Sequence, residues 1–264
     1  MPDDPAGPVS YPAEIEGFLR RMALGLPGAF RFRMLNTFEH FRRALLLLEV
    51  DREMASFRAI TGEEEAATAL IKAMQLRKYP DAKRFNARDH QHKVAVRACV
   101  LAIANQLHPA LREFQLTFNF ETKRIDIKIP LSNFGVNGGD NYCVQPVEPL
   151  DFLHSQPGAD ENSLFEGALQ SFAKRSNFEG IKRMVAELSN SRNRLLYASD
   201  AAVPKSVATA EMIENRRSSA MILLVIGIMI LQSRKHLGLV LQASQAFLRI
   251  IDKLPPEAKL SESA

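Results

Sequence analysis

The stretch at residues 191–206 holds the side chain with the clearest potential for chemistry. Arg192 lies four residues after Leu188 and three before Leu195, so it falls on the apolar stripe of the helix that the spacing predicts here. A guanidinium keeps its proton inside a protein, and on a buried face it must be paired with an acid or directed into a cleft. We therefore expect the chain to be built around Arg192.

Two glutamates far upstream are the expected partners if Arg192 has a structural role. Glu64 closes the run Thr61-Gly-Glu-Glu, which is typical of a capping box with Thr61 as the N-cap, and Glu65 follows it. A buried pair between Arg192 and Glu64 or Glu65 would hold two helices in register, and such pairs have the electrostatics of functional sites. A structural and a functional role for Arg192 both stay open, and they are compatible.

Histidines on the helix expected at about residues 89–107 are a second candidate group. His92 shares one helix face with three apolar residues, Val96, Cys99 and Ile103. Its ring is therefore expected to point into the core as a hydrogen-bonded histidine, with His90 and Lys93 further round the helix. Two residues apart on a helix, His90 and His92 point to different faces, which argues against a metal-binding pair.

Composition places the chain among ordinary globular proteins. Of its 264 residues 46% are apolar and 24% are charged, and 34 basic against 30 acidic residues leave a net charge of +4. That charge is compatible with a phosphate-bearing partner without being diagnostic of one. The two cysteines lack metal-ligand spacing, so neither a metal site nor a cofactor is predicted. We expect a cytoplasmic protein, because the first residues lack a signal-peptide pattern.

Hydrophobic periodicity predicts a mostly helical chain. The expected helices cover residues 13–24, 36–60, 61–77, 89–107, 163–174, 178–197, 206–233 and 236–254. The apolar run at residues 220–231 is too short to span about 30 Å of hydrocarbon, so we expect a buried central helix and no membrane partner.

One β-hairpin is expected between the helices. Phenylalanines and leucine alternate with polar residues from Phe114 to Phe120, and isoleucines alternate from Ile125 to Ile129, with a turn at residues 121–124. A lone hairpin is marginal, so its apolar face should dock on the helices or on a second copy of the chain. Residues 131–157 are expected to be irregular. The predicted fold class is an all-α bundle with an inserted hairpin at about residues 113–130.

The motif around Arg192 resembles a known signature. Arg192-x-x-x-Leu196-Tyr197-x-x-Asp200 is similar to the sequence near the C-terminus of AbiV-type abortive-infection proteins, members of the HEPN superfamily of helical domains. Many of these domains are metal-independent ribonucleases whose motif is an Arg, a polar residue and, four to six positions on, a His. Arg192 and Asn193 match this pattern, whereas Tyr197 occupies the position of the His.

A second resemblance lies upstream. Glu64-Glu65-Ala-Ala-Thr68 and His92-Lys93 are similar to the Glu-Glu-x-x-Lys and His-Lys patches of AbiV-like proteins, with Thr68 where Lys is usual. The two resemblances cover roughly residues 44–107 and 178–254. They imply a single HEPN-like helical domain at residues 13–254. The Pro- and Asp-rich residues 1–12 and the polar residues 255–264 are expected to be disordered tails.

The resemblance also implies a chemistry and partners. In a HEPN ribonuclease the His takes the proton of a ribose 2′-hydroxyl, which attacks the adjacent phosphate, and the Arg stabilises the charge that gathers there. Arg192 suits the phosphate role because its planar fork matches phosphate oxygens, and Asn193 can position the same phosphate. RNA and a second copy of the chain are the implied partners. The implied binding residues are Glu64, Glu65, His92, Lys93 and Asp200.

Tyr197 leaves catalysis open. A phenol with a pKa of about 10 is a poor general base near neutral pH, although it can donate a hydrogen bond to a phosphate or stack on a base. His92 would supply the missing base if the bundle brings it near Arg192. Three functions follow: an RNA-acting defence protein, a non-catalytic relative that binds RNA or a protein partner, and a helical scaffold in which Arg192 is structural. The hairpin is our first candidate for a partner-specific surface.

Overall fold

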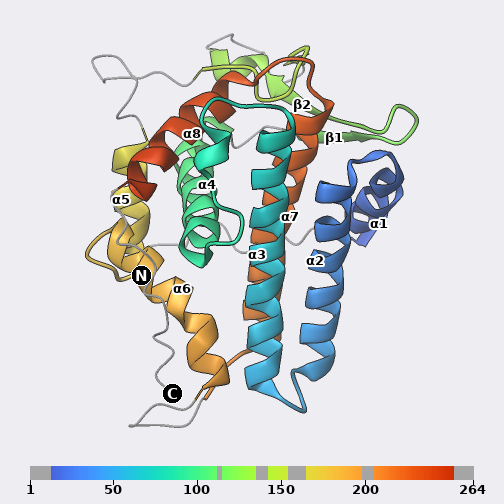
Figure 1. Cartoon of the computed structure of the whole chain (residues 1–264). Helices are drawn as coiled ribbons and strands as arrows, with labels where there is room; N and C mark the ends of the chain where they lie inside the picture. The colour runs from blue at the N-terminus through green and yellow to red at the C-terminus, as the bar shows by residue number, and fades with distance from the viewer. Residues whose placement is uncertain (1–12, 112–114, 135–141, 154–164, 198–204, 253–264) are drawn as a thin grey trace.

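The computed structural model describes residues 13–111, 115–134, 142–153, 165–197 and 205–252, and most of them are helical (Figure 1). The predicted tails, at residues 1–12 and 255–264, lie outside the described residues, as do Phe114, Asp200 and Pro204. The coarse prediction of a helical bundle with an inserted β-hairpin is confirmed.

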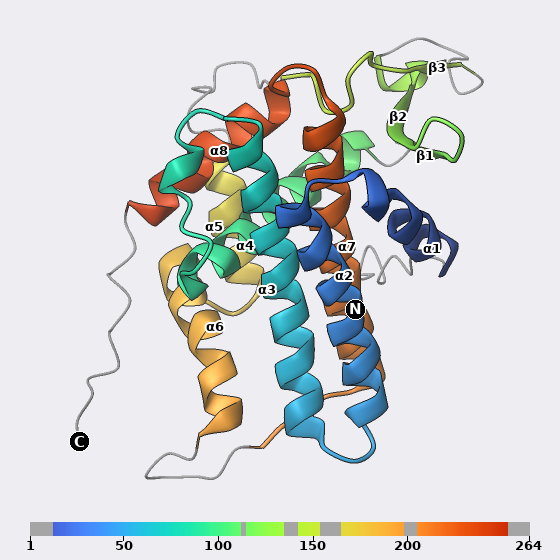
Figure 2. The same ribbon diagram turned by 45° about the vertical axis from the view of Figure 1, so that its right-hand side comes forward.

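Helix α3 (Arg52–Leu76) stands at the centre of the bundle (Figures 1 and 2). It packs on α2 (Gly28–Leu47) and α7 (Ala210–Gln232) on one side, and it contacts α4 (His90–Leu111) and α6 (Ile181–Leu196) on the other. Every element that carries a candidate site residue therefore meets α3.

The remaining helices enclose this centre. Helix α1 (Ala13–Met22) lies beside α2, while α5 (Glu166–Arg175) and α8 (Gly238–Ile251) pack on α4. Short 3₁₀ turns occupy Ala23–Gly25, Ala82–Arg84 and Leu131–Phe134. Outside residues 28–76, each predicted helix overlaps a described helix, with ends that differ by a few residues.

The division between α2 and α3 differs from the prediction. Helix α3 begins after Asp51, whose Oδ1 accepts a hydrogen bond from the amide of Met54 at 2.9 Å. Thr61 is therefore not an N-cap: it lies inside α3, where its hydroxyl donates to the carbonyl of Phe57 at 2.8 Å. The predicted helix at 36–60 and the one at 61–77 were wrong at this boundary, because tertiary packing carries the helix through Gly62.

Two glycines allow aromatic rings to approach helix backbones. A Cβ at Gly62 of α3 would lie 2.9 Å from Cε2 of Phe41 on α2. A Cβ at Gly227 of α7 would overlap the ring of Phe30 on α2, lying 3.0 Å from its Cζ and nearer still to its Cε2. Both rings are fully buried, so glycine at these positions sets how closely α2 meets its two neighbours.

The hairpin pairs β1 (Gln115–Asn119) with β2 (Arg124–Pro130) in antiparallel register, Leu116 opposite Ile127 and Phe118 opposite Ile125. A third short strand, β3 (Cys143–Val144), pairs with the end of β2, where the sequence predicted irregular structure. Two residues of pairing leave too little periodicity to recognise from sequence.

The hairpin docks on helices of its own chain. Ile125, Ile127 and Ile129 are buried, and Phe18 of α1 packs edge-on against Phe118 and Phe120 with ring centroids 5.2 and 4.7 Å apart. Gln232, at the end of α7, accepts a hydrogen bond from the Ile125 amide at 3.2 Å. Its amide nitrogen donates to the Lys123 carbonyl. The apolar face of β2 is therefore covered within the monomer.

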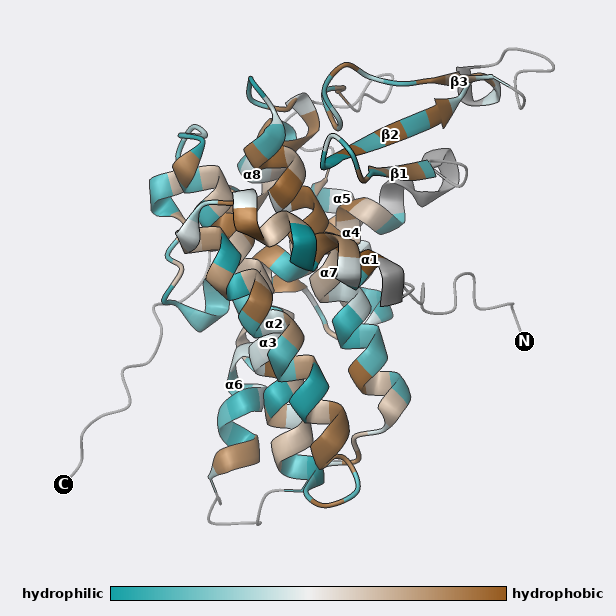
Figure 3. Cartoon of the chain, turned by 90° about the vertical axis from the view of Figure 1, so that its right-hand side faces the viewer, coloured by the Kyte–Doolittle hydropathy of each residue, from teal (hydrophilic) through white to brown (hydrophobic). Residues whose placement is uncertain are grey.

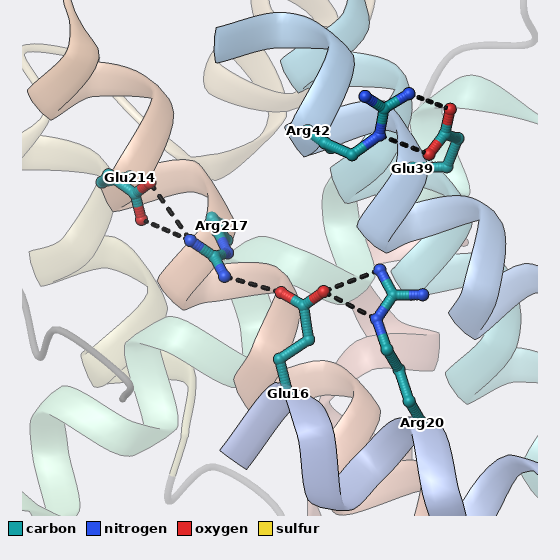
Figure 4. Close-up of polar contacts among 6 residues, drawn as sticks. All are labelled: Glu16, Arg20, Glu39, Arg42, Glu214 and Arg217. Atoms are coloured by element: carbon teal, nitrogen blue, oxygen red, sulfur yellow. Dashed lines mark hydrogen bonds and ion pairs between the residues drawn. The ribbon is translucent and has the colours of Figure 1, made fainter. Parts of the chain in front are cut away.

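An ion-pair cluster fixes α1 against α7 (Figure 4). The Glu16 carboxylate accepts from Arg20 one turn later at 2.7 Å and from Arg217 of α7 at 2.6 Å. Arg217 also pairs with Glu214 at 3.2 Å. The Arg217 side chain is only 26% exposed, so its ion pair with Glu16 holds α1 against α7 with little screening by solvent. The Glu39–Arg42 pair in the same view is more exposed and lies within α2, so it contributes less.

Helix α7 is the predicted buried central helix. Its apolar run packs between α2 and α3, with Leu224, Ile228 and Ile230 fully buried. In the described part of the chain, no helix combines the length and the apolar character that crossing a bilayer requires.

We predict that Gly227→Ala destabilises the protein by about 1–3 kcal/mol, because the added methyl group overpacks against Phe30 and this outweighs the gain in helix propensity. Gly167→Ala in α5 is the matched control, since nothing lies within 4 Å of its added Cβ. Urea unfolding followed by circular dichroism measures both variants. An unchanged or raised midpoint for Gly227→Ala would contradict the close packing of α2 and α7.

Candidate functional site

Two adjacent carboxylates are buried at the centre of the bundle. Glu63 and Glu64 follow one another on α3, and their side chains are 5% and 7% exposed. A buried carboxylate is strongly disfavoured unless basic groups and hydrogen bonds replace the water it loses. The helices packed on α3 must therefore supply cations at this level.

Helices α4 and α7 supply the cations for Glu63. Arg97 of α4 places its Nε 2.6 Å from Oε1 of Glu63, and Arg216 of α7 hydrogen-bonds Oε2. The carboxylate thereby joins three helices, because each partner comes from a different one.

Glu64 meets three basic side chains from α4 and α6. His90 Nδ1 lies 3.0 Å from Oε1, while Lys93 Nζ and Arg192 Nη1 lie 3.7 and 3.6 Å from Oε2. The predicted pair between Arg192 and Glu64 is thus present. Thr68, one turn further along α3, donates its hydroxyl to the Glu64 carbonyl at 2.8 Å and takes no part in the ion pairs.

Arg192 and His90 also contact each other directly. Arg192 Nη1 lies 3.1 Å from Nε2 of His90. A guanidinium only donates, so Nε2 is the acceptor and the ring proton resides on Nδ1, from which it is donated to Glu64. Glu64, His90 and Arg192 therefore form a chain in which the carboxylate fixes both the tautomer and the orientation of the imidazole.

The two ends of this chain differ in access to solvent. Glu64 is 7% exposed, whereas the His90 and Arg192 side chains are 30% and 29% exposed. The guanidinium of Arg192 also lies over the ring of Phe57 at 5.1 Å from its centroid. A ligand can therefore reach His90 and Arg192 but not the carboxylate that orients them.

In the described part of the chain, three buried side-chain nitrogens in and near Arg192 lack a hydrogen bond. Nε of Arg192, Nε of Arg58 and Nδ1 of His40 are buried and have no hydrogen-bond partner among the described residues. Burial, and then the charges of Arg58, Arg43 and Arg192, lower the pKa of His40 from its ordinary value of 6.5. This part of the molecule thus holds buried nitrogens that the described residues do not satisfy.

Two hollows lead toward the buried carboxylates. A small cavity of about 30 Å³ is lined by Glu63, Glu64, Lys93 and Arg97. It shares Ile60, Ser191 and Arg216 with an open cleft of about 330 Å³ between α3, α6 and the start of α7. Arg194 and Lys205 also line that cleft. Arg194 pairs with Glu187 at 3.2 Å and Arg216 pairs with Glu63, so part of the positive charge of the cleft is neutralised within the chain. An anionic ligand would compete with these carboxylates for the two arginines.

The other sequence-predicted residues lie apart from the ion-pair chain. Asn193 is exposed on α6, and Tyr197, 67% exposed, follows the last residue of that helix. The Tyr197 hydroxyl has no hydrogen-bond partner among the described residues, and only its amide is bonded, to the Asn193 carbonyl. Glu65 is half-buried and joins none of the ion pairs formed by described residues. Asp200 lies outside the described residues.

The histidine that contacts Arg192 is His90, whereas the sequence analysis proposed His92 for this role. His92 accepts a hydrogen bond from the Asn86 amide at 3.0 Å, and its Nε2 lies 3.7 Å from Asp89. Its predicted character as a hydrogen-bonded, largely buried histidine is confirmed. These two contacts are local to the start of α4, which the ring of His92 therefore supports.

Sequence reasoning missed Glu63, His90 and Arg216, although spacing held a signal for two of them. His90, Lys93 and Arg97 recur at intervals of three and four, so they share one face of α4. Glu63 lies on the same stripe of α3 as Ile60, Ala67 and Leu70, a carboxylate on an apolar face. Arg216 had no comparable signal, because it precedes the apolar part of α7.

The described residues contain no group of three or more histidine, cysteine, aspartate or glutamate side chains placed to hold a metal ion. Comparison of the chain with protein-family models, curated proteins and solved structures gave no match. The protein is therefore defined by its fold and site alone: a helical bundle with a docked hairpin and a buried carboxylate pair. The resemblance to AbiV-type proteins stays a prediction from the motif residues.

We predict that Glu64→Gln lowers the free energy of unfolding by about 3 kcal/mol, because His90, Lys93 and Arg192 would lose their shared counter-charge. Glu65→Gln is the matched control on the next residue, with an expected change below about 1 kcal/mol. Urea unfolding at pH 7 measures both. Equal effects of the two substitutions would show that Glu64 does not organise the three cations.

We predict that stability falls as the pH drops below about 6.5, and that His40→Gln reduces this fall. The lowered pKa keeps His40 neutral in the folded chain, whereas the unfolded chain binds a proton below about pH 6.5. The contribution is complete above that pH, and its slope is at most about 1.4 kcal/mol per pH unit. Unfolding in urea at pH 7.5 and 5.5 measures it, with the exposed His236→Gln as control. An unaltered pH dependence in His40→Gln would refute it.

Proposed function

We propose that this protein acts on RNA as a HEPN-like, metal-independent ribonuclease in phage defence or a stress response, with His90 as its general base. The observation that carries the proposal is the chain Glu64–His90–Arg192, in which a buried carboxylate orients an accessible imidazole beside an accessible guanidinium. His90 supplies from α4 the histidine that Tyr197 replaces in the motif of α6.

The proposed reaction uses groups that are already in contact. When a phosphate of the RNA binds Arg192, the Nη1 end of its guanidinium turns from His90 Nε2 to the phosphate oxygens. The freed Nε2 accepts the proton of the ribose 2′-hydroxyl, and the 2′-oxygen attacks the phosphorus. The 5′-oxygen leaves with a proton returned from His90, and a 2′,3′-cyclic phosphate remains.

Charge stabilisation in this reaction comes from basic side chains around the phosphate. Arg192 faces the negative charge that gathers on the phosphate, and Lys93 is the next cation on the His90 face of α4. Arg194 and Lys205 line the cleft between α3, α6 and the start of α7, and we assign them to a neighbouring part of the RNA backbone. Glu64 keeps His90 in the required tautomer and orientation.

A structural role for the same residues is the second candidate. The burial of Glu64 among three cations favours it, since such a carboxylate joins α3, α4 and α6 whether or not RNA binds. In that case the protein is a non-catalytic helical module that binds RNA or a protein partner. The partial exposure of His90 and Arg192 favours the first candidate, because a purely structural pair gains nothing from being accessible.

Self-association belongs to the same proposal. HEPN-like domains bring two motifs together across a dimer cleft, so we propose that two copies of this chain place their Arg192 residues in one cleft. Light scattering during gel filtration, at concentrations that span the micromolar range, measures the mass. A monomer that cleaves RNA would show that one Glu64–His90–Arg192 chain is sufficient.

The deciding experiment is incubation of labelled single-stranded RNA and transfer RNA with the protein in the presence of a metal chelator. We predict cleavage by the wild type, with activity reduced at least about 100-fold in His90→Ala and in Arg192→Ala, as expected for loss of a general base or of a phosphate-binding group. Mass spectrometry should find a 2′,3′-cyclic phosphate on the 5′ product.

The controls come from the same two helices. Arg194→Ala removes an exposed arginine two residues from Arg192, and Tyr197→Phe removes the phenol hydroxyl at the end of α6. We expect Tyr197→Phe to keep wild-type activity and Arg194→Ala to lose only a few-fold. Circular dichroism and unfolding midpoints confirm that each variant is folded. Cleavage that persists in folded His90→Ala, or no cleavage by any form, would refute the proposed reaction.

A further inference from the structure

An apolar cavity lies in the half of the bundle that carries α8, away from the carboxylate pair. Its volume is about 170 Å³, and α3, α4, α7 and α8 all contribute to its wall. Much of the ribbon where α4, α7 and α8 meet is hydrophobic (Figure 3). The lining includes Met74, Val96, Cys99, Ile226, Leu239 and Ala243.

This cavity is partly open to solvent, and its lining is almost entirely apolar. Apolar side chains that do not pack against other protein atoms forgo dispersion contacts, which an apolar ligand can restore. An engineered apolar cavity of about 150 Å³ binds benzene. The cavity described here has a similar volume, so it is large enough for one aromatic ring.

The chemistry of the wall excludes a polar or charged occupant. The hydroxyl group of Ser244, which lines the cavity, already donates to the Leu241 carbonyl at 2.8 Å. The Cys99 thiol is directed at the Ala243 carbonyl at 3.8 Å, and burial raises its pKa to about 12. Among the described residues, no other ionisable side chain lines the cavity. A ligand with a charge or an unsatisfied donor would lose its hydration and gain no partner.

We propose that this cavity is a binding site for an uncharged apolar small molecule, of the size of a single aromatic ring or a short alkyl chain. Its binding is independent of the RNA chemistry proposed for Glu64, His90 and Arg192, because no residue lining the cavity belongs to that chain. Such a ligand replaces the missing packing contacts and stabilises the folded state.

The test is calorimetric unfolding of the whole chain with increasing benzene, with sodium benzoate as the charged ligand of the same ring. We expect benzene to raise Tm progressively with its concentration, as for a ligand of the native state, and benzoate to leave Tm unchanged. No rise of Tm with benzene would overturn the proposal.

Two filling variants locate the site. Ala243→Leu on α8 and Ala104→Leu on α4 each place a larger side chain in the cavity, and either should abolish the benzene-induced shift. Gln245→Leu is the control, since it adds the same side chain at an exposed position of α8 and should keep the full shift. A shift of equal size in wild type and in both folded filling variants would place the binding elsewhere and overturn the proposal.

The two cysteines give an independent readout. Cys99 lines the cavity and is buried, whereas Cys143 is exposed. We expect benzene to slow the reaction of Cys99 with N-ethylmaleimide several-fold and to leave Cys143 unaffected, as resolved by mass spectrometry of peptides. Equal slowing of both thiols would count against occupancy of the cavity.

Discussion

The central constraint on this protein is the neutralisation of two consecutive buried carboxylates. Glu63 and Glu64 leave water together on α3, and the attraction of nearby cations must offset the loss of hydration. The cations come from three other helices: Arg97, His90 and Lys93 from α4, Arg192 from α6 and Arg216 from α7. The ion pairs therefore specify how the helices are rotated about α3, while apolar burial supplies the general driving force for their association.

The same constraint prepares the site for chemistry. A carboxylate that must be buried and paired holds an imidazole in one tautomer, and the imidazole in turn accepts from a guanidinium that solvent can reach. Glu64 thus contributes both to stability and to the proposed function. His90 and Arg192 are needed mainly for the proposed function. A substitution at Glu64 affects folding first, whereas substitutions at the two accessible residues would separate the proposed catalysis from folding. Further buried nitrogens without a hydrogen-bond partner among the described residues belong to Arg192, Arg58 and His40.

Close backbone packing explains where sequence reasoning about the fold was wrong. The capping box at Thr61 is locally convincing, yet the helix begins at the Asp51 cap and continues through Gly62, whose missing side chain leaves room for the ring of Phe41. The hairpin shows the opposite case. Its alternating isoleucines predicted both the strands and a covered face, and only the structure showed that α1 and α7 of the same chain cover it.

By itself, the sequence determined the helical class, the hairpin and the importance of Arg192, because periodicity and a charge on an apolar stripe are local signals. It also placed Glu64 among the partners of Arg192. It proposed Tyr197 and His92 as the residues that act beside Arg192, whereas the structure brings His90 to that position. It did not identify the pair of the buried Glu63 and Arg216. Those assignments depend on how α4, α6 and α7 are rotated about α3. Only the tertiary structure decides that rotation, because residues about 100 positions apart meet through packing that no short spacing records.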